Sequence, residues 1–260
     1  MLDNSYISYF DFANLLADAS AEILRAGFKT KLNVEQKADS SPVTQIDIEV
    51  EKRIRSLIEV EFPEHGIIGE EFGNIREDSP YQWVIDPIDG TKSFIAGETT
   101  FTTLIALLHN GKPIIGLIDQ PVLRERWAAI SGQTTLYNNK PLAILNNKNT
   151  LEKATISTTS IGYFTTGQEK KFAKLRNVAA NTSLGGDAYA YAILASGKLD
   201  IVVDAGMKPY DFCALPPIIE GVGGIISDWA GKPLTLSSDG SVIACANKEL
   251  HRQTLEFLQN

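Results

Sequence analysis

The chain has 260 residues, of which 43% are hydrophobic and 22% charged. This balance is typical of a globular protein and excludes a disordered or low-complexity chain. The net charge of -8 disfavours nonspecific binding to nucleic acid or anionic membranes. Two distant cysteines, no basic leader and no long apolar run predict a cytoplasmic protein without disulfide bonds, with neither nucleic acid nor membrane as a partner.

Two helices are expected at the start of the chain. Apolar residues recur at helical spacing from about Tyr9 to Ala26, and Gly27 follows as a helix end. A second helical pattern runs from Asp47 to Val60 and predicts a helix packed beside the first. Asp47 ends the polar loop before that helix, so its carboxylate could cap the helix or take part in chemistry.

The next segment is rich in β-favouring residues. The expected strands are Ile67–Ile68, Trp83–Ile85, Thr102–Leu108 and Pro113–Asp119. We expect the second strand to stop at Pro87, which donates no hydrogen bond, and the last two to form a hairpin around Asn110-Gly111.

The later half repeats this mixture of elements. The expected elements are a helix from about Asp187 to Ser196, a strand over Leu199–Val203, a helix over Ala214–Gly221 and a strand near Ile225. Alternating strands and helices predict a layered α/β protein. We expect one unit over residues 1–260, with a subdomain division near residues 140–150, where Asn and Lys cluster.

The sequence WVIDPIDGTKSF, from Trp83 to Phe94, carries the strongest chemical signal. Asp86 and Asp89 fall within one turn, and neighbouring carboxylates repel each other unless they are protonated or bridged by cations. All-oxygen ligands favour a hard ion such as Mg²⁺. Gly90 leaves room for a ligand near the main chain, and the amides and hydroxyl around Thr91 suit a phosphate. Acidic turns with Pro and Gly also occur as ordinary loops.

Two further acids stand in comparable places. Glu70 follows the Ile67–Ile68 strand, so adjacent strands could bring it to Asp86 at one sheet edge. Asp211 precedes an apolar helix, which it could cap, or it could face a metal. The histidines fit no metal-ligand spacing, and we interpret each as a surface or loop residue; they are His65, His109 and His251.

Taken together, three segments resemble the inositol monophosphatase family of magnesium-dependent, lithium-sensitive phosphatases. They are Gly69-Glu70-Glu71, the run from Trp83 to Thr91, and the Asp211 segment leading into Glu220–Gly224. The resemblance covers nearly the whole chain and implies a layered α-β-α-β-α sugar-phosphatase fold and a homodimer. It also implies two or three Mg²⁺ ions per site, held by the carboxylates of Glu70, Asp86, Asp89 and Asp211 and by the carbonyl of Ile88.

The same resemblance implies the catalytic roles. Thr91 and Asp47 would orient and help deprotonate the attacking water, and Glu70 would contribute through a further water. The amides of Gly90 and Thr91 would bind the phosphate of a small phosphate ester. The residues expected to contact substrate are Asp86, Ile88, Asp89, Gly90, Thr91, Gly186, Asp187, Asp204 and Asp211.

Within the family, several segments resemble in sequence those of the histidinol-phosphatase branch, including Ser183–Tyr191 and Tyr210-Asp211-Phe212. Asp187 and Asp204 would suit the ammonium and imidazole groups of histidinol phosphate better than an uncharged polyol. Alternatively, Asp187 caps its helix and Asp204 ends a strand at the surface. We therefore expect hydrolysis of L-histidinol phosphate for histidine biosynthesis. The alternatives are an inositol or broad monophosphatase, and a regulatory binding module that acts on transcription or ribosome-assembly machinery.

Overall fold

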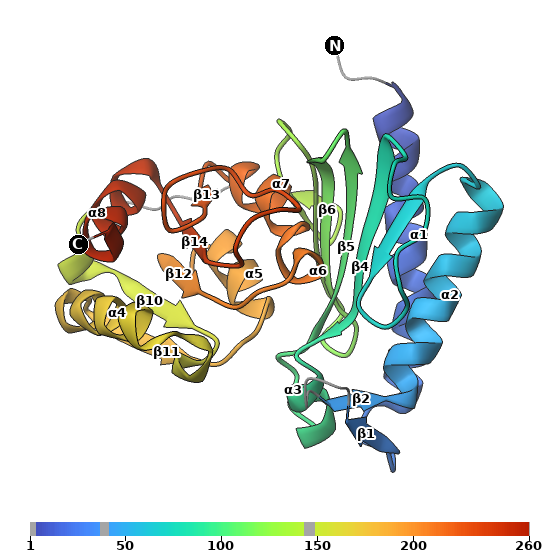
Figure 1. Ribbon diagram of the computed structural model, residues 1–260, viewed down its shortest axis with the longest axis horizontal. Helices are drawn as coiled ribbons and strands as arrows, with labels where there is room; N and C mark the ends of the chain where they lie inside the picture. Colours follow the sequence, from blue (N-terminus) through green and yellow to red (C-terminus); the bar gives the residue numbers. More distant parts are fainter. Residues whose placement is uncertain (1–3, 37–41, 143–148, 260) are drawn as a thin grey trace.

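The computed structural model describes residues 4–36, 42–142 and 149–259. These residues form five layers in which helices and sheets alternate (Figure 1). Three clusters of buried apolar side chains fill the spaces between neighbouring layers. The expected α-β-α-β-α arrangement is therefore confirmed.

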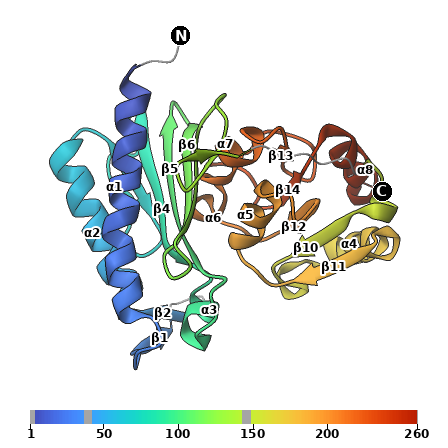
Figure 2. The same ribbon diagram turned by 180° about the vertical axis from the view of Figure 1, so that it is seen from behind.

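The first layer consists of α1 (Asn4–Gly27) and α2 (Gln45–Glu61), which lie side by side against one face of the first sheet (Figure 2). Thr44 caps α2, because its Oγ1 accepts hydrogen bonds from the amides of Ile46 and Asp47. The Asp47 carboxylate in turn accepts the Thr44 amide proton at 2.8 Å. Asp47 is thus the third residue of the helix and not its cap, and the reciprocal bonds fix its side chain.

The first sheet has seven strands. In spatial order they are β3 (Gly66–Gly69), β4 (Tyr81–Asp89), β5 (Thr102–His109), β6 (Lys112–Gln120), β7 (Glu125–Ile130), β8 (Leu136–Tyr137) and β9 (Lys140–Pro141). The β3–β4 pair is parallel, and the other neighbours are antiparallel. Along β5, Leu104 and Ala106 face the middle layer, whereas Ile105 and Leu107 pack against α1 and α2. The expected hairpin at Asn110-Gly111 joins β5 to β6.

The sequence predicts that the strand carrying the acidic motif stops at Pro87, but the strand continues past it. β4 continues to Asp89, with a register shift between Asp86 and Asp89. Pro87 lies inside this bulge, where no ladder amide is needed, and its carbonyl accepts a hydrogen bond from Thr103 Oγ1 at 2.9 Å. The bulge sets the directions of the two aspartates.

Short helices fill the middle layer between the two sheets. They are α5 (Tyr189–Ala195), α6 (Pro209–Phe212) and α7 (Leu215–Glu220). Their apolar residues pack with one face of β4–β6 and with β12 and β14 of the second sheet. The helix expected from Asp187 begins two residues later, because residues 185–187 have positive φ and cannot continue a right-handed helix.

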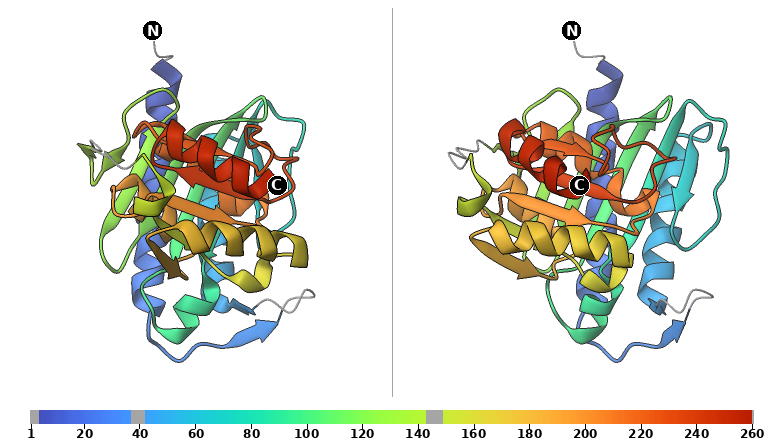
Figure 3. Two further views of the ribbon diagram at one scale, coloured as in Figure 1. Left: turned by 90° about the vertical axis from the view of Figure 1, so that its left-hand side faces the viewer. Right: turned by 60° about the vertical axis from the view of Figure 1, so that its left-hand side comes forward.

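The second sheet has five strands. In spatial order they are β11 (Asn181–Leu184), β10 (Thr155–Thr158), β12 (Ile201–Asp204), β14 (Val242–Cys245) and β13 (Ile225–Ser227). β11, β10 and β12 are parallel, and β14 is antiparallel to both of its neighbours. The outer helices α4 (Thr166–Val178) and α8 (Lys248–Gln259) lie side by side over its far face (Figure 3).

The smaller elements complete the described chain. They are the strands β1 (Val34–Gln36) and β2 (Pro42–Thr44), the helix α3 (Thr91–Ala96), and the 3₁₀ turns η1 (Leu151–Lys153) and η2 (Ile161–Tyr163). The chain passes from the first sheet to the second between residues 141 and 155, and residues 143–148 of the expected division lie outside the described part. None of the described helices has the length and apolar character needed to cross a bilayer.

Two of the three histidines are buried, contrary to the sequence interpretation. His65 stacks between the rings of Phe62 and Tyr81, with centroids 4.7 and 5.0 Å away, and its Nδ1 accepts a hydrogen bond from Trp83 Nε1 at 3.2 Å. His251 lies 2.7 Å from the Ser227 hydroxyl on β13. Aromatic stacking and a hydrogen bond accommodate the His65 ring, and the contact with Ser227 accommodates the His251 ring. Both cysteines are free and buried.

Candidate active site

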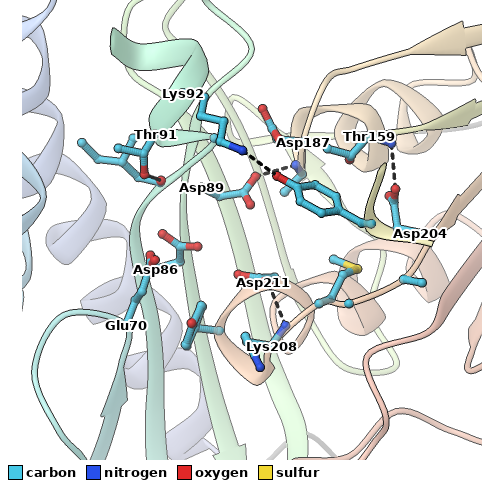
Figure 4. Close-up of a pocket in the computed structure, with 18 of the residues that line it drawn as sticks. Glu70, Asp86, Asp89, Thr91, Lys92, Thr159, Asp187, Asp204, Lys208 and Asp211 are labelled. Carbon is cyan, nitrogen blue, oxygen red and sulfur yellow. Dashed lines mark hydrogen bonds between the residues drawn. The ribbon is translucent and has the colours of Figure 1, made fainter. Parts of the chain in front are cut away.

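The acidic residues meet in a cavity of about 380 Å³ between the two halves of the molecule (Figure 4). The end of β4 and the start of α3 form one wall, and segments of the second half form the other. The lining residues are Pro42, Glu70, Asp86, Ile88, Asp89, Gly90, Thr91, Lys92, Thr159, Tyr163, Asp187, Ala188, Asp204, Ala205, Gly206, Met207, Lys208, Tyr210 and Asp211. Residues far apart in sequence thus form one site.

Parallel pairing of β3 and β4 places Glu70 beside Asp86. Gly69 is the register partner of Ile85, so the next residues of the two strands, Glu70 and Asp86, reach the same edge of the sheet. Figure 4 shows the two carboxylates near each other, Glu70 just after the end of β3 and Asp86 on β4. The sequence predicts that Glu70 and Asp86 meet because their strands are adjacent, and the structure has this arrangement.

Three aspartates from two layers form a compact cluster. Asp86 and Asp89 come from β4 and Asp211 comes from α6, and each contributes a carboxylate oxygen within 4.8 Å of the others. Asp211 does not cap α6; it is the third helical residue and accepts the Lys208 amide proton at 2.7 Å. Asp89 accepts the amide proton of Ala188 at 2.5 Å. Backbone donors of the second half therefore fix two of the three carboxylates.

The cluster strongly favours neutralisation of its charge. Burial, reinforced by the charge of Glu70, raises the pKa of Asp86 well above its usual range. Burial and the nearby Asp187 likewise raise the pKa of Asp89 well above its usual range. Burial raises the pKa of Asp211 to about 7. Protonation or a bound cation would relieve this repulsion.

The donor set fits a hard divalent cation. Asp86 Oδ1 is buried and has no hydrogen-bond partner among the described residues, so one buried acceptor of this aspartate lacks a protein donor. All three clustered ligands are carboxylate oxygens, which suit Mg²⁺. Glu70 and Ile88 line the same cavity but stand outside the group of three.

Asp47 and Thr91 connect α2 to the cavity. Asp47 is fully buried, and its Oδ2 accepts the hydroxyl proton of Thr44 at 2.5 Å. Its other oxygen, Oδ1, lies 3.3 Å from Thr91 Oγ1, which is also 3.1 Å from the carbonyl of Ile88. Burial raises the pKa of Asp47, and the charge of Glu70 adds to this shift. A hydroxyl that lines the cavity is thus backed by a buried carboxyl group.

Gly90 opens the α3 turn beside the acidic cluster. Its φ of +86° lies in the left-handed region, which favours glycine. The first amides of a helix have no acceptor within the helix, so the turn from Gly90 to Thr91 can present donors to an anion. This places the expected phosphate-binding segment next to the expected cation ligands.

Asp187 and Asp204 also line the cavity, and neither adopts the simpler structural role that the sequence offered as an alternative. Asp187 does not cap α5; it has a φ of +45°, follows Gly186, and accepts a hydrogen bond from Ser93 Oγ at 3.0 Å. Asp204 is not at the surface, since it is 4% exposed. Its carboxylate accepts hydrogen bonds from the Thr159 amide at 2.7 Å and the Tyr191 hydroxyl at 3.0 Å.

Two lysines and a tyrosine at the cavity were given no role from the sequence. Lys92, in the first turn of α3, donates a hydrogen bond to the Tyr163 hydroxyl at 3.4 Å, and both residues line the cavity. Lys208 precedes α6 and also lines the cavity. The position of Lys92 directly after the Gly90-Thr91 turn was a usable signal, whereas the approach of Tyr163 depends on tertiary structure.

Fold and cavity together place the chain among metal-dependent phosphatases of layered α/β architecture. The profile of the inositol monophosphatase family matches residues 6–260, and the chain belongs to this family. It is 45% identical over 255 residues to bifunctional phosphatase IMPL2, chloroplastic, of Arabidopsis thaliana, covering 95% of this chain and 73% of that protein. It is 31% identical to a histidinol-phosphatase of Mycobacterium tuberculosis, covering 94% and 95% of the two chains.

A solved structure agrees with these sequence relationships. An inositol monophosphatase from Zymomonas mobilis superposes with a TM-score of 0.90 at 41% identity, over 98% of this chain and 99% of that one. The family acts on small phosphate esters and is generally metal-dependent. The expected family and fold are confirmed.

Proposed function

We propose that the protein hydrolyses L-histidinol phosphate to L-histidinol and phosphate in a reaction that depends on Mg²⁺. The observation that carries this proposal is the Asp187 carboxylate, which lines the cavity close to Asp89 and the Gly90 turn. The histidinol-phosphatase relative supports the same substrate. Cytoplasmic location and a homodimer belong to this proposal.

Asp86, Asp89 and Asp211 would hold the cation, with Glu70 and the Ile88 carbonyl at the same cavity. When bound, Mg²⁺ would supply Lewis acidity toward the phosphoryl oxygens. The chain itself would bind the phosphate through the amides of the α3 turn, as donors placed where negative charge develops.

Thr91 and Asp47 would handle the proton of the attacking water. The Thr91 hydroxyl points its proton at Asp47 Oδ1 or at the Ile88 carbonyl, so its lone pairs stay available to a water in the cavity. As the water attacks, its proton passes to Thr91 Oγ1 and the Thr91 proton passes to Asp47 Oδ1. The raised pKa of Asp47 makes this carboxylate a better base.

Asp187 would bind the cationic end of the substrate. Ser93 occupies one of its oxygens, Oδ2, and no hydrogen bond from a described residue reaches Oδ1. An ammonium or imidazolium group can therefore bind without displacing a protein donor. Asp204 is the poorer candidate for direct contact, because hydrogen bonds engage both of its oxygens.

The test is phosphate release from L-histidinol phosphate and from myo-inositol 1-phosphate in parallel, with Asp86→Asn as the blank. We expect the cationic ester to be preferred by about tenfold or more, since one lost charge-assisted contact costs about 1.5–3 kcal/mol. Asp187→Asn should remove that preference and leave turnover of the uncharged ester largely intact. Equal losses on both esters would reject the proposed role of Asp187.

A second candidate is an inositol monophosphatase, because the Zymomonas mobilis structure described under that name is 41% identical to this chain. This activity would use the same cation ligands and the same pair of Thr91 and Asp47. Preference for the inositol ester would support it. Failure of the wild-type chain to hydrolyse either ester would instead favour a binding module of the same fold.

A further inference from the structure

Helix α2 presents three charged side chains at intervals of four residues on one face. They are Asp47, Glu51 and Arg55, and this spacing places them one above the other along the helix. Asp47 reaches Thr91 at the cavity, as described above. Glu51 and Arg55 contact the loop that follows β3 instead, so one rigid helix touches two separate parts of the site.

Glu51 is fully buried, and its carboxylate binds the backbone directly after Glu70. Oε2 accepts the amide proton of Glu71 at 2.8 Å, and Oε1 accepts that of Phe72 at 3.2 Å. Burying an unpaired carboxylate costs several kcal/mol by order of magnitude. The two amide donors and the guanidinium of Arg55 compensate this cost for Glu51.

Arg55 completes the contact between α2 and this loop. Its Nε donates to Glu51 Oε1 at 2.7 Å. Its Nη2 donates to the carbonyls of Phe72 and Gly73, at 2.6 and 3.0 Å. One ion pair on α2 therefore binds two amides and two carbonyls of the 71–73 backbone.

Gly69, the residue before Glu70, lies close to the same Glu51 carboxylate. A Cβ atom at Gly69 would overlap Glu51 Oε1, so the absence of a side chain at Gly69 allows the close approach. Glu51 thus packs against the residue preceding Glu70 and binds the two amides following it. The backbone on both sides of Glu70 is fixed relative to α2.

We propose that the Glu51–Arg55 pair is a positioning device that orients Glu70 toward the cation site. The inference rests on the proposed function, in which Glu70 contributes to Mg²⁺ binding. Neither Glu51 nor Arg55 lines the cavity, so both act through the 69–73 backbone. Because Asp47 lies on the same helix face, α2 sets the relative placement of Glu70 and the Thr91–Asp47 pair.

The test measures Mg²⁺ binding alone, by isothermal titration calorimetry, for wild type and for Glu51→Gln. We expect binding about 10–100-fold weaker in the variant, the usual effect of losing a partner that orients a metal ligand. Glu249→Gln is the matched control, since it breaks an exposed Glu–Arg pair on α8 and should leave the affinity unchanged. Hydrogen exchange at the amides of Glu71 and Phe72 should accelerate in Glu51→Gln.

A double-mutant cycle separates positioning from general structural damage. If Glu51 acts through Glu70, the double variant Glu51→Gln/Glu70→Gln binds Mg²⁺ no more weakly than Glu70→Gln alone. Additive losses would overturn the inference. Wild-type affinity in Glu51→Gln alongside weakened Glu70→Gln would overturn it too. Wild-type affinity in Glu70→Gln would show instead that the proposed role of Glu70 is wrong, and the inference would fall with it.

A milder change covers the case in which Glu51→Gln does not fold. Arg55→Lys keeps the positive charge but cannot reach Glu51 and the two carbonyls together, because an ammonium lacks the guanidinium fork. Weaker Mg²⁺ binding with unchanged circular dichroism would support the inference. Unchanged binding and unchanged exchange at residues 71–73 would count against it.

Discussion

Asp187 occupies the space that a side chain at Gly90 would need. A Cβ atom at position 90 would lie 2.5 Å from Asp187 Oδ2, and Gly90 has a φ of +86°. The loop that holds the proposed substrate-binding carboxylate therefore packs directly on the turn expected to bind phosphate. The proposed carboxylate for the substrate's cation and the proposed phosphate-binding turn thus meet at one glycine.

Gly90→Ala should be destabilised by backbone strain and by displacement of Asp187. Strain of this kind costs about 1–3 kcal/mol, and the clash adds to it. Urea denaturation would measure the loss. Gly111→Ala is the matched control, because Gly111 also has positive φ but nothing lies within 4 Å of the added Cβ. A loss no larger than in Gly111→Ala would contradict the clash.

Asp211 should make the metal-free protein less stable as the pH rises. Its pKa is about 7 in the folded chain against 3.8 for the ordinary group. The folded state therefore holds more protons between these values, and the free energy of unfolding falls across that window. The contribution is complete below pH 3.8 and lost above about pH 7. Mg²⁺ should reverse the loss, because a bound cation favours the ionised carboxylates.

Thermal unfolding in EDTA, with and without excess Mg²⁺, would test this relationship. Asp211→Asn keeps an acceptor for the Lys208 amide but cannot ionise. Without metal at neutral pH, it should melt at a higher temperature than wild type, and the difference should shrink toward pH 4. It should also gain less from Mg²⁺. A wild type that remained the more stable protein in EDTA at neutral pH would contradict the predicted repulsion.

The sequence predicted a layered α/β protein and the proximity of Glu70 to Asp86 for reasons that are local. Apolar periodicity marks each face, and parallel pairing of two adjacent strands is enough to bring Glu70 to Asp86. The caps were less predictable, because Thr44 and Asp47 are both good capping residues and the backbone decides between them. A strand signal broken by Pro87 likewise gave no indication that a bulge would carry β4 on to Asp89.

Other features depend on long-range packing. Asp204 looks like a strand end in the sequence, yet Thr159 and Tyr191 come from other elements to bury and bind it. His65 is buried by an aromatic stack in which one partner, Tyr81, comes from a different element, β4. The contact between Glu51 and the Glu70 loop also spans two elements. The four-residue spacing between Asp47 and Glu51 was visible in the sequence and could have indicated that both side chains lie on one face of the helix.

Thr91→Ala should reduce turnover by about 10²–10⁴-fold, the usual effect of losing a group that transfers a proton. The variant lacks the hydroxyl between Asp47 and the cavity but retains the clustered aspartates. Its Mg²⁺ affinity, measured by calorimetry, should therefore be unchanged. Thr91→Ser keeps the hydroxyl and should recover most of the turnover. If Thr91→Ser were as impaired as Thr91→Ala, the methyl group rather than the proton path would be responsible.

Asp204→Asn should affect stability more than substrate choice, in contrast to Asp187→Asn. The Asp204 carboxylate accepts hydrogen bonds from Thr158, Thr159 and Tyr191, and an amide would replace one acceptor with a donor facing other donors. Each buried group left unpaired costs about 1–3 kcal/mol, so urea denaturation should show a clear loss. Turnover of histidinol phosphate and inositol phosphate should fall by similar factors. A selective loss of histidinol phosphate turnover, with stability retained, would instead place Asp204 in direct contact with the substrate.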